Sequence, residues 1–163
     1  MTYMKRTDFF QLIQPLTDKL YRFAFAMMPD DLQAEQLVID SFNAYLIKEK
    51  KSILRQEVDL TQKKTLPVIR RKHFKGILQH MMTIGLRRSI QLNEQLKISR
   101  PDDFKAFYDL DPKVRSVLAL RFEAQFSVEE IEDMTAMPKY EVIEKIHNGR
   151  FLLLNHLNAG ASL

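Results

Sequence analysis

The sequence predicts an all-α fold built from two small helical domains. Apolar residues recur at intervals of three and four along almost every long segment, which is the period of an amphipathic helix rather than of a strand. The chain has 163 residues, of which 45% are hydrophobic and 28% charged, and this composition supports one or two small cores. Residues 99–102 are polar and indicate a linker. We therefore expect one domain at residues 1–96, a linker at 97–108 and a second domain at 109–163.

Capping and helix-breaking residues bound the first three helices. Thr7 is the expected N-cap of the first helix, Pro15 begins a second helix and Pro29 ends it. Asp30 or Asp31 is expected to cap a third helix, which forms an antiparallel pair with the second. The core-facing stripe of this third helix comprises Leu32, Leu37, Val38, Ser41, Phe42, Tyr45 and Leu46.

A connector and a fourth helix complete the first domain. The helical pattern weakens after Lys48, and polar residues indicate a connector near residues 58–64. Pro67 then opens a helix, because proline is tolerated in a first helical turn. The core-facing stripe of this helix comprises Ile69, Phe74, Ile77, Leu78, Met81, Met82 and Leu86.

The second domain is expected to contain a helix-turn-helix. Asp111 caps its first helix, and Ser127 with Glu130 three residues later forms a capping box for the next. A tight turn at residues 135–138 leads into the last helix, in which Gly149 permits close approach of a neighbour. The apolar faces comprise Val114, Val117, Leu118 and Phe122 in the first helix and Val142, Ile146, Leu153 and Leu157 in the last. In this motif the second helix of the pair can enter the major groove of DNA.

Charge is distributed unevenly along the chain. Residues 1–47 carry 4 basic and 6 acidic side chains, residues 48–100 carry 14 and 4, and residues 101–163 carry 7 and 11. A basic block of this kind suits contact with a phosphate backbone, where neutralised phosphates release counterions. The same charges would also suit solvated helix faces, so charge alone leaves both interpretations open.

Several protein classes are excluded by composition. The chain has no cysteine, so it has no disulfide framework, thiolate zinc site or cysteine nucleophile, and we expect it in the cytoplasm. No apolar run approaches the roughly 20 residues of a membrane helix. With only 4 glycines there is no glycine-rich phosphate loop, and the spacing of His73, His80, His147 and His156 does not form a metal-binding pattern. We therefore expect neither an enzyme nor a metal or other cofactor.

Two separated stretches carry recognisable motifs. Residues 20–24 read LYRFA and residues 34–42 read AEQLVIDSF, while residues 110–122 read LDPKVRSVLALRF and residues 126–131 read FSVEEI. The first two runs resemble the first two helices of the compact two-domain sigma factors called the extracytoplasmic-function group. The last two resemble the promoter-binding C-terminal domain of that family. The resemblance covers most of the chain in the order typical of the family.

This resemblance implies a subunit that binds core RNA polymerase and promoter DNA. The first domain would bind the polymerase clamp through Gln36, Asp40 and Asn43 and open the minus-ten element, and the second would read the minus-thirty-five element. An anti-sigma factor is a further partner that the resemblance allows. The residues expected at DNA are Arg70, Arg71, Lys72, Lys75, Arg87 and Arg88 in the first domain and Lys139, Lys145 and Arg150 in the second.

Departures from the family pattern leave a second interpretation open. The chain has no tryptophan to stack on an unpaired base, and Ile77-Leu78 stands where the family has tryptophan-leucine. The last helix carries Glu141 and Glu144, which are poorly suited to face phosphates. The chain is therefore either an active initiation factor or a degenerate sigma-like module that binds an anti-sigma factor or polymerase without normal promoter reading.

Overall fold

The computed structural model describes residues 4–55, 63–93, 95–96 and 104–161. Within these ranges the chain forms helices and turns and no strand, which confirms the all-α prediction. Most of the predicted connector and the polar run at residues 99–102 lie outside the described residues. None of the described helices is both long and apolar enough to cross a bilayer.

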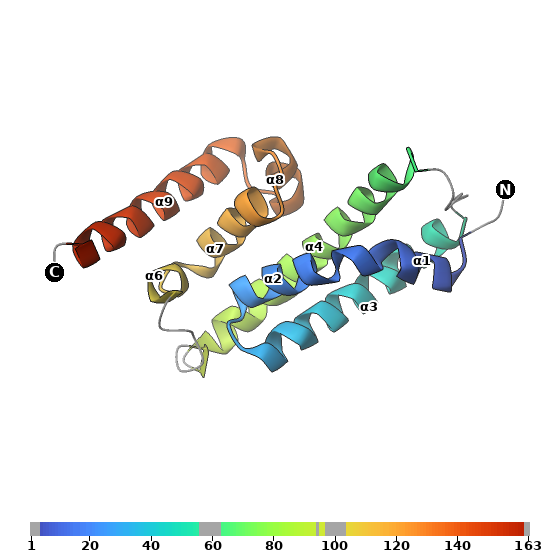
Figure 1. Ribbon diagram of the computed structural model, residues 1–163, viewed down its shortest axis with the longest axis horizontal. Coiled ribbons are helices and arrows are strands. Elements are labelled where there is room, and N and C mark those ends of the chain that lie inside the picture. The colour runs from blue at the N-terminus through green and yellow to red at the C-terminus, as the bar shows by residue number, and fades with distance from the viewer. Residues whose placement is uncertain (1–3, 56–62, 94, 97–103, 162–163) are drawn as a thin grey trace.

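The first half of the chain contains four helices. These are α1 (Arg6–Ile13), α2 (Thr17–Met27), α3 (Asp31–Arg55) and α4 (Leu66–Gln91), and a 3₁₀ turn (Gln14–Leu16) joins the first two. The long helices α3 and α4 are antiparallel, and α1 and α2 follow one another along this pair (Figure 1). The core of this half includes the fully buried Phe9, Phe23, Met27, Leu37, Ile77, Leu78 and Met81.

Two of the predicted details in this half are wrong. Thr7 lies inside α1, because the carboxylate of Asp8 accepts a hydrogen bond from the backbone N–H of Lys5 at 2.8 Å and the helix begins at Arg6. Leu32 is 78% exposed, since it lies on the face of α3 opposite to Leu37. The predicted cap of α3 is confirmed, because the backbone N–H of Gln33 donates to Asp30 at 2.9 Å.

The second half contains four more helices. They are α6 (Lys105–Tyr108), which falls inside the predicted linker, α7 (Pro112–Leu118), α8 (Val128–Thr135) and α9 (Lys139–Ala161). The predicted caps are confirmed: Lys113 N–H donates to Asp111 at 2.9 Å, and Ser127 and Glu130 form a reciprocal capping box. A Cβ atom at Gly149 would lie 2.7 Å from Cδ1 of Leu118, so the predicted close approach is also confirmed.

Helix α7 continues directly into a π-helical segment, Ala119–Glu123. A π-helical turn holds more residues than an α-helical turn, so it rotates Phe122 away from the line of Val117 and Leu118. Phe122 is 52% exposed for this reason, and the prediction that it belongs to the apolar core face is wrong.

The two halves pack against each other. Helices α2 and α4 contact α7, α8 and the π-helical segment, and the buried apolar residues of both halves belong to one cluster. The rings of Phe74 and Phe126 stack across this seam with centroids 5.9 Å apart. Helix α9 packs on α6, α7 and α8 and lies on the opposite side of the molecule from α3 (Figure 1). The seam therefore joins the two halves, and α9 adds a long outer surface.

Candidate functional site

The outward face of α3 presents a stripe of exposed side chains. The stripe has the 3–4 spacing of one helical face and consists of Leu32, Gln36, Ile39, Asn43 and Ile47. Its aliphatic members are 78%, 52% and 81% exposed, in that order along the chain. We call this set the α3 stripe. It includes two of the three residues predicted to bind polymerase, and it adds three large aliphatic side chains that the sequence did not predict to be a binding surface, since Leu32 was assigned to the core.

The third residue predicted to bind polymerase, Asp40, borders the stripe, and its carboxylate is hydrogen-bonded within the protein. Its carboxylate accepts a hydrogen bond from the guanidinium of Arg88 on α4 and another, at 2.9 Å, from the side-chain amide of Gln36. The hydrogen bond from Arg88 lowers the pKa of Asp40, so the carboxylate stays ionised. Asp40 therefore fixes the orientation of Gln36 and ties α3 to α4.

Two hollows flank the α3 stripe. A cavity of about 530 Å³ lies between the start of the chain and α3, with Phe10, Phe42 and Asn43 among its walls. The rings of Phe10 and Phe42 lie 5.2 Å apart at this place. A second hollow of about 400 Å³ also has Asn43 in its wall, lies further toward the end of α3 and is lined in part by Ile47. A partner that covers the stripe could insert side chains into both hollows.

Most of the basic residues predicted to contact DNA on α4 contact the protein itself. Arg70 donates to the backbone carbonyl of Leu12 at 2.8 Å. Arg71 donates to both carboxylate oxygens of Glu130 at 3.1 and 3.2 Å, and its guanidinium lies 4.6 Å from the ring centre of Phe126.

Two further basic residues of α4 also form ion pairs, one across the seam to α8 and one to α3 within the first half. Lys75 lies 4.0 Å from Asp133 of α8, and Arg88 is paired with Asp40 as described above. Lys72 and Arg87 are exposed. The acidic helix α8 thus covers part of the basic surface of α4, and the DNA-contact prediction for these residues stays a prediction.

A second basic surface lies at one end of the helical pair. The end of α3 and the residues that precede α4 both lie at this end (Figure 1), and they carry exposed lysines. The set, which we call the basic end, comprises Lys48, Lys50, Lys51, Lys63 and Lys64. None of these lysines forms an ion pair with another residue that the structure describes. The sequence placed them in the basic block but did not distinguish them from the paired residues of α4.

The basic residues predicted on the last helix also have partners within the second half. Lys139 pairs with Glu129 at 3.1 Å, and Lys145 lies 3.5 Å from Glu141 one turn earlier. The guanidinium of Arg150 lies 5.6 Å from the ring centre of Phe122.

The outer face of α9 is largely apolar. Its exposed members, which we call the α9 stripe, are Tyr140, Ile143, His147, Phe151 and Leu154. Their spacing of three and four places them on one side of the helix. A helix that reads base edges presents hydrogen-bond donors and acceptors to the groove, and this stripe offers few of them.

His73 of α4 is buried in the core of the first half, where it packs against other core residues. Nδ1 of His73 lies 2.6 Å from the hydroxyl oxygen of Tyr45 in the core. Burial lowers the pKa of His73 to about 4 and raises that of Tyr45 to about 12, so both groups are neutral at neutral pH. Among the described residues no three potential ligand side chains come together in a metal-binding group.

Comparisons with models of known protein families and with curated proteins found no significant match to this chain.

Proposed function

We propose that this chain is a sigma-like transcription initiation factor of the cytoplasm that docks on the clamp of core RNA polymerase through the α3 stripe. The observation that carries this proposal is the stripe itself. Three large aliphatic side chains and two amides are exposed in one line on a long helix, and two of the three polymerase contacts implied by the sequence resemblance, Gln36 and Asn43, fall on the same line.

The stripe has the chemistry of a protein-binding surface. Exposed aliphatic side chains in a contiguous line mark interaction sites, because burial against a partner removes their apolar area from water. A helix face of this spacing fits a groove on a partner. The amides of Gln36 and Asn43 add directional hydrogen bonds, and Asp40 holds Gln36 in position.

Promoter DNA is the second partner in this proposal. The basic end supplies lysines that form no ion pair with a described residue and can neutralise phosphates, and the exposed Lys72 and Arg87 on α4 extend the positive surface. Binding of forked promoter DNA should therefore weaken steeply with salt. Replacing Lys63 and Lys64 with glutamine should reduce the slope of log affinity against log salt by about two units if both contact phosphates.

The docking surface can be tested with matched charge insertions. Ile39→Arg and Asn43→Arg place a guanidinium in the stripe, whereas Thr83→Arg places one at an exposed position of α4. We expect the first two variants to lose co-purification with core RNA polymerase by at least tenfold, and the third to retain it. All three should keep wild-type helicity, because exposed substitutions usually change stability by less than about 0.5 kcal/mol. Equal co-purification of all three variants would exclude the α3 stripe as the docking site.

A second candidate function is a protein-interaction module that does not read promoters. Two observations favour it: the α9 stripe is apolar where a reading helix would be polar, and α8 pairs its acidic side chains with Arg71 and Lys75. A titration of the full chain with promoter DNA in low salt separates the two functions. Saturable binding supports the initiation factor. If the chain instead binds polymerase without binding DNA, the interaction module is favoured.

A further inference from the structure

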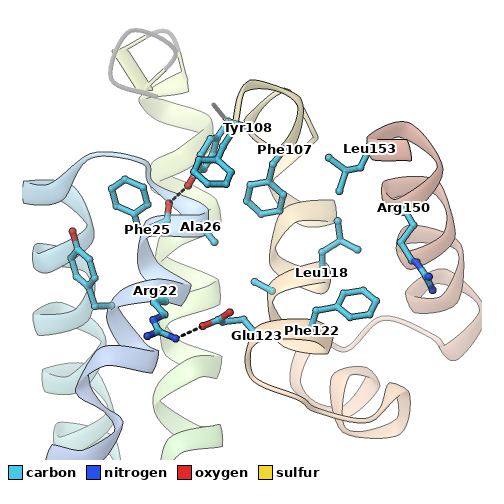
Figure 2. Close-up of a pocket in the computed structure, with 13 residues that line it drawn as sticks. Arg22, Phe25, Ala26, Phe107, Tyr108, Leu118, Phe122, Glu123, Arg150 and Leu153 are labelled. Carbon is cyan, nitrogen blue, oxygen red and sulfur yellow. Dashed lines mark hydrogen bonds and ion pairs between the residues drawn. The ribbon is translucent and has the colours of Figure 1, made fainter. Parts of the chain in front are cut away.

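A cavity of about 620 Å³ opens at the seam between the two halves (Figure 2). Helix α2 forms one side, α9 forms the other, and α6, α7 and the π-helical segment lie between them. Its walls are mostly aromatic and aliphatic. The aromatic members are Tyr21, Phe25, Phe104, Phe107, Tyr108 and Phe122. The volume falls within the range of about 300 to 1,000 Å³ that is usual for small-molecule sites, which also favour the junctions between domains.

Most of the polar groups that line the cavity already have partners within the protein, which leaves one positive charge for a ligand. The hydroxyl groups of Tyr21 and Tyr108 already donate, to Asp31 at 2.6 Å and to the carbonyl of Phe25 at 3.3 Å. Two further wall residues, Arg22 and Glu123, neutralise each other in an ion pair.

Arg150 is the remaining charged group of the wall. Its guanidinium lies 5.6 Å from the ring centre of Phe122, and it forms no ion pair with a carboxylate of the described residues. The cavity therefore combines a broad apolar wall with one uncompensated cation at its side.

We infer that this cavity binds a small amphipathic carboxylate, with an apolar body against the aromatic walls and its single anionic end at Arg150. An apolar body gains free energy from leaving water, and a guanidinium is the side chain best suited to hold a carboxylate in two parallel hydrogen bonds. A cationic ligand of the same shape would bring like charge to Arg150 and is disfavoured.

Binding at this place would strengthen the packing of the two halves. The ligand would touch Phe25 and Ala26 of α2 and Phe107 and Leu118 of the second half at the same time. A ligand that binds only the packed state raises its stability in proportion to the logarithm of ligand concentration. This inference does not depend on polymerase docking, because the cavity and the α3 stripe lie on different helices.

The test compares two probes of equal length and opposite charge, decanoate and decylamine, by isothermal titration calorimetry on the full chain. We expect one saturable site for decanoate and at least tenfold weaker binding of decylamine. Decanoate at 100 times its Kd should raise the Tm by roughly 5 to 10 °C. Equal affinity for the two probes, or no saturable binding of decanoate, would overturn the inference.

Variants of the wall then locate the site. Ala26→Leu fills part of the cavity and should weaken decanoate binding at least tenfold. Arg150→Gln should weaken it roughly tenfold, the value of one charge-assisted contact, and should leave decylamine binding unchanged or improved. Glu123→Gln should strengthen decanoate binding, because it frees Arg22 from its partner.

Matched controls exclude adsorption elsewhere. Lys113→Gln removes an exposed charge of α7 outside the cavity, and Phe151→Gln removes an exposed aromatic side chain of the α9 stripe. Both should retain wild-type affinity for decanoate, and circular dichroism should show that each variant is folded. If Phe151→Gln abolishes binding while Ala26→Leu retains it, the ligand binds the α9 stripe and the cavity assignment is wrong.

Discussion

Arg115 is the side chain whose replacement should weaken the packing of the two halves most. It is only 5% exposed, although it carries a guanidinium. Its nitrogen atoms donate to four backbone carbonyls: those of Ala26 and Met27 at the end of α2, at 3.1 and 3.0 Å, and those of Tyr108 and Leu110 at 3.1 and 2.8 Å. The buried guanidinium thus satisfies the last carbonyls of α2 and holds the residues at the start of the second half against them.

The stability lost in Arg115→Met depends on how many of these carbonyls are left without a hydrogen-bond donor. Met27 keeps a hydrogen bond from the hydroxyl of Ser89 at 3.1 Å, but the carbonyls of Ala26, Tyr108 and Leu110 lose these donors. A buried acceptor left without a partner costs about 1 to 3 kcal/mol, and the partly buried ones cost less because water can reach them. Removal of the buried charge offsets part of this loss. We expect a net loss of about 3 kcal/mol in the free energy of unfolding.

Urea unfolding followed by circular dichroism measures this loss. Arg115→Lys keeps the charge but replaces the planar donor fork with one ammonium group, so it should lose about half as much stability as the methionine variant. The control is Arg121→Met, which removes one hydrogen bond at 3.2 Å from an exposed side chain and should cost less than about 1 kcal/mol. If Arg115→Met is as stable as Arg121→Met, the reasoning is refuted.

Three further predictions concern the core and the caps. Gly149→Ala should lower the free energy of unfolding by about 1 kcal/mol in urea titrations, because the contacts of its Cβ with Leu118 and Val114, at 2.7 and 2.9 Å, outweigh the gain in helix propensity. Gly149→Val should lower it further. An alanine variant that is more stable than wild type would contradict the close approach. Ser127→Ala should cost about 1 kcal/mol through loss of the α8 cap, measured in the same way, and a neutral effect would contradict the cap. The folded state lowers the pKa of His73 to about 4, so the stabilising contribution of the neutral imidazole is fully present above pH 6.5 and is lost between pH 6.5 and 4, by on the order of 2 to 3 kcal/mol. In a plot of the free energy of unfolding against pH, His73→Gln should flatten this part of the curve relative to wild type. Parallel curves would contradict the buried neutral histidine.

Local chemistry explains which parts of the fold could be predicted from the sequence. The helix caps at Asp30, Asp111 and Ser127 depend on residues two or three positions away, so their motifs were sufficient. The all-α class followed from apolar spacing in the same way. The start of α1 and the exposure of Phe122 were missed, because Asp8 offered a competing cap and the π-helical segment changed the helical period.

Contacts between distant segments could not be predicted. Arg71 and Glu130 are 59 positions apart, and Arg115 is 88 positions from Met27. Periodicity shows which face of a helix is apolar but not which other helix covers it. The sequence therefore identified a basic block, whereas only the packing of α4 against α3 and α8 distinguishes its ion-paired members from the lysines of the basic end, which form no ion pair with a described residue.

Site-specific photocrosslinking gives the most direct test of the proposed docking surface. A benzoylphenylalanine placed at Asn43 in the α3 stripe is compared with one placed at Thr83 on α4, each in the full chain mixed with core RNA polymerase from the same organism. We predict that the probe at position 43 crosslinks to the subunit that carries the clamp and that the probe at position 83 does not. Absence of a crosslink from position 43, in a chain that is folded, would contradict docking through the α3 stripe.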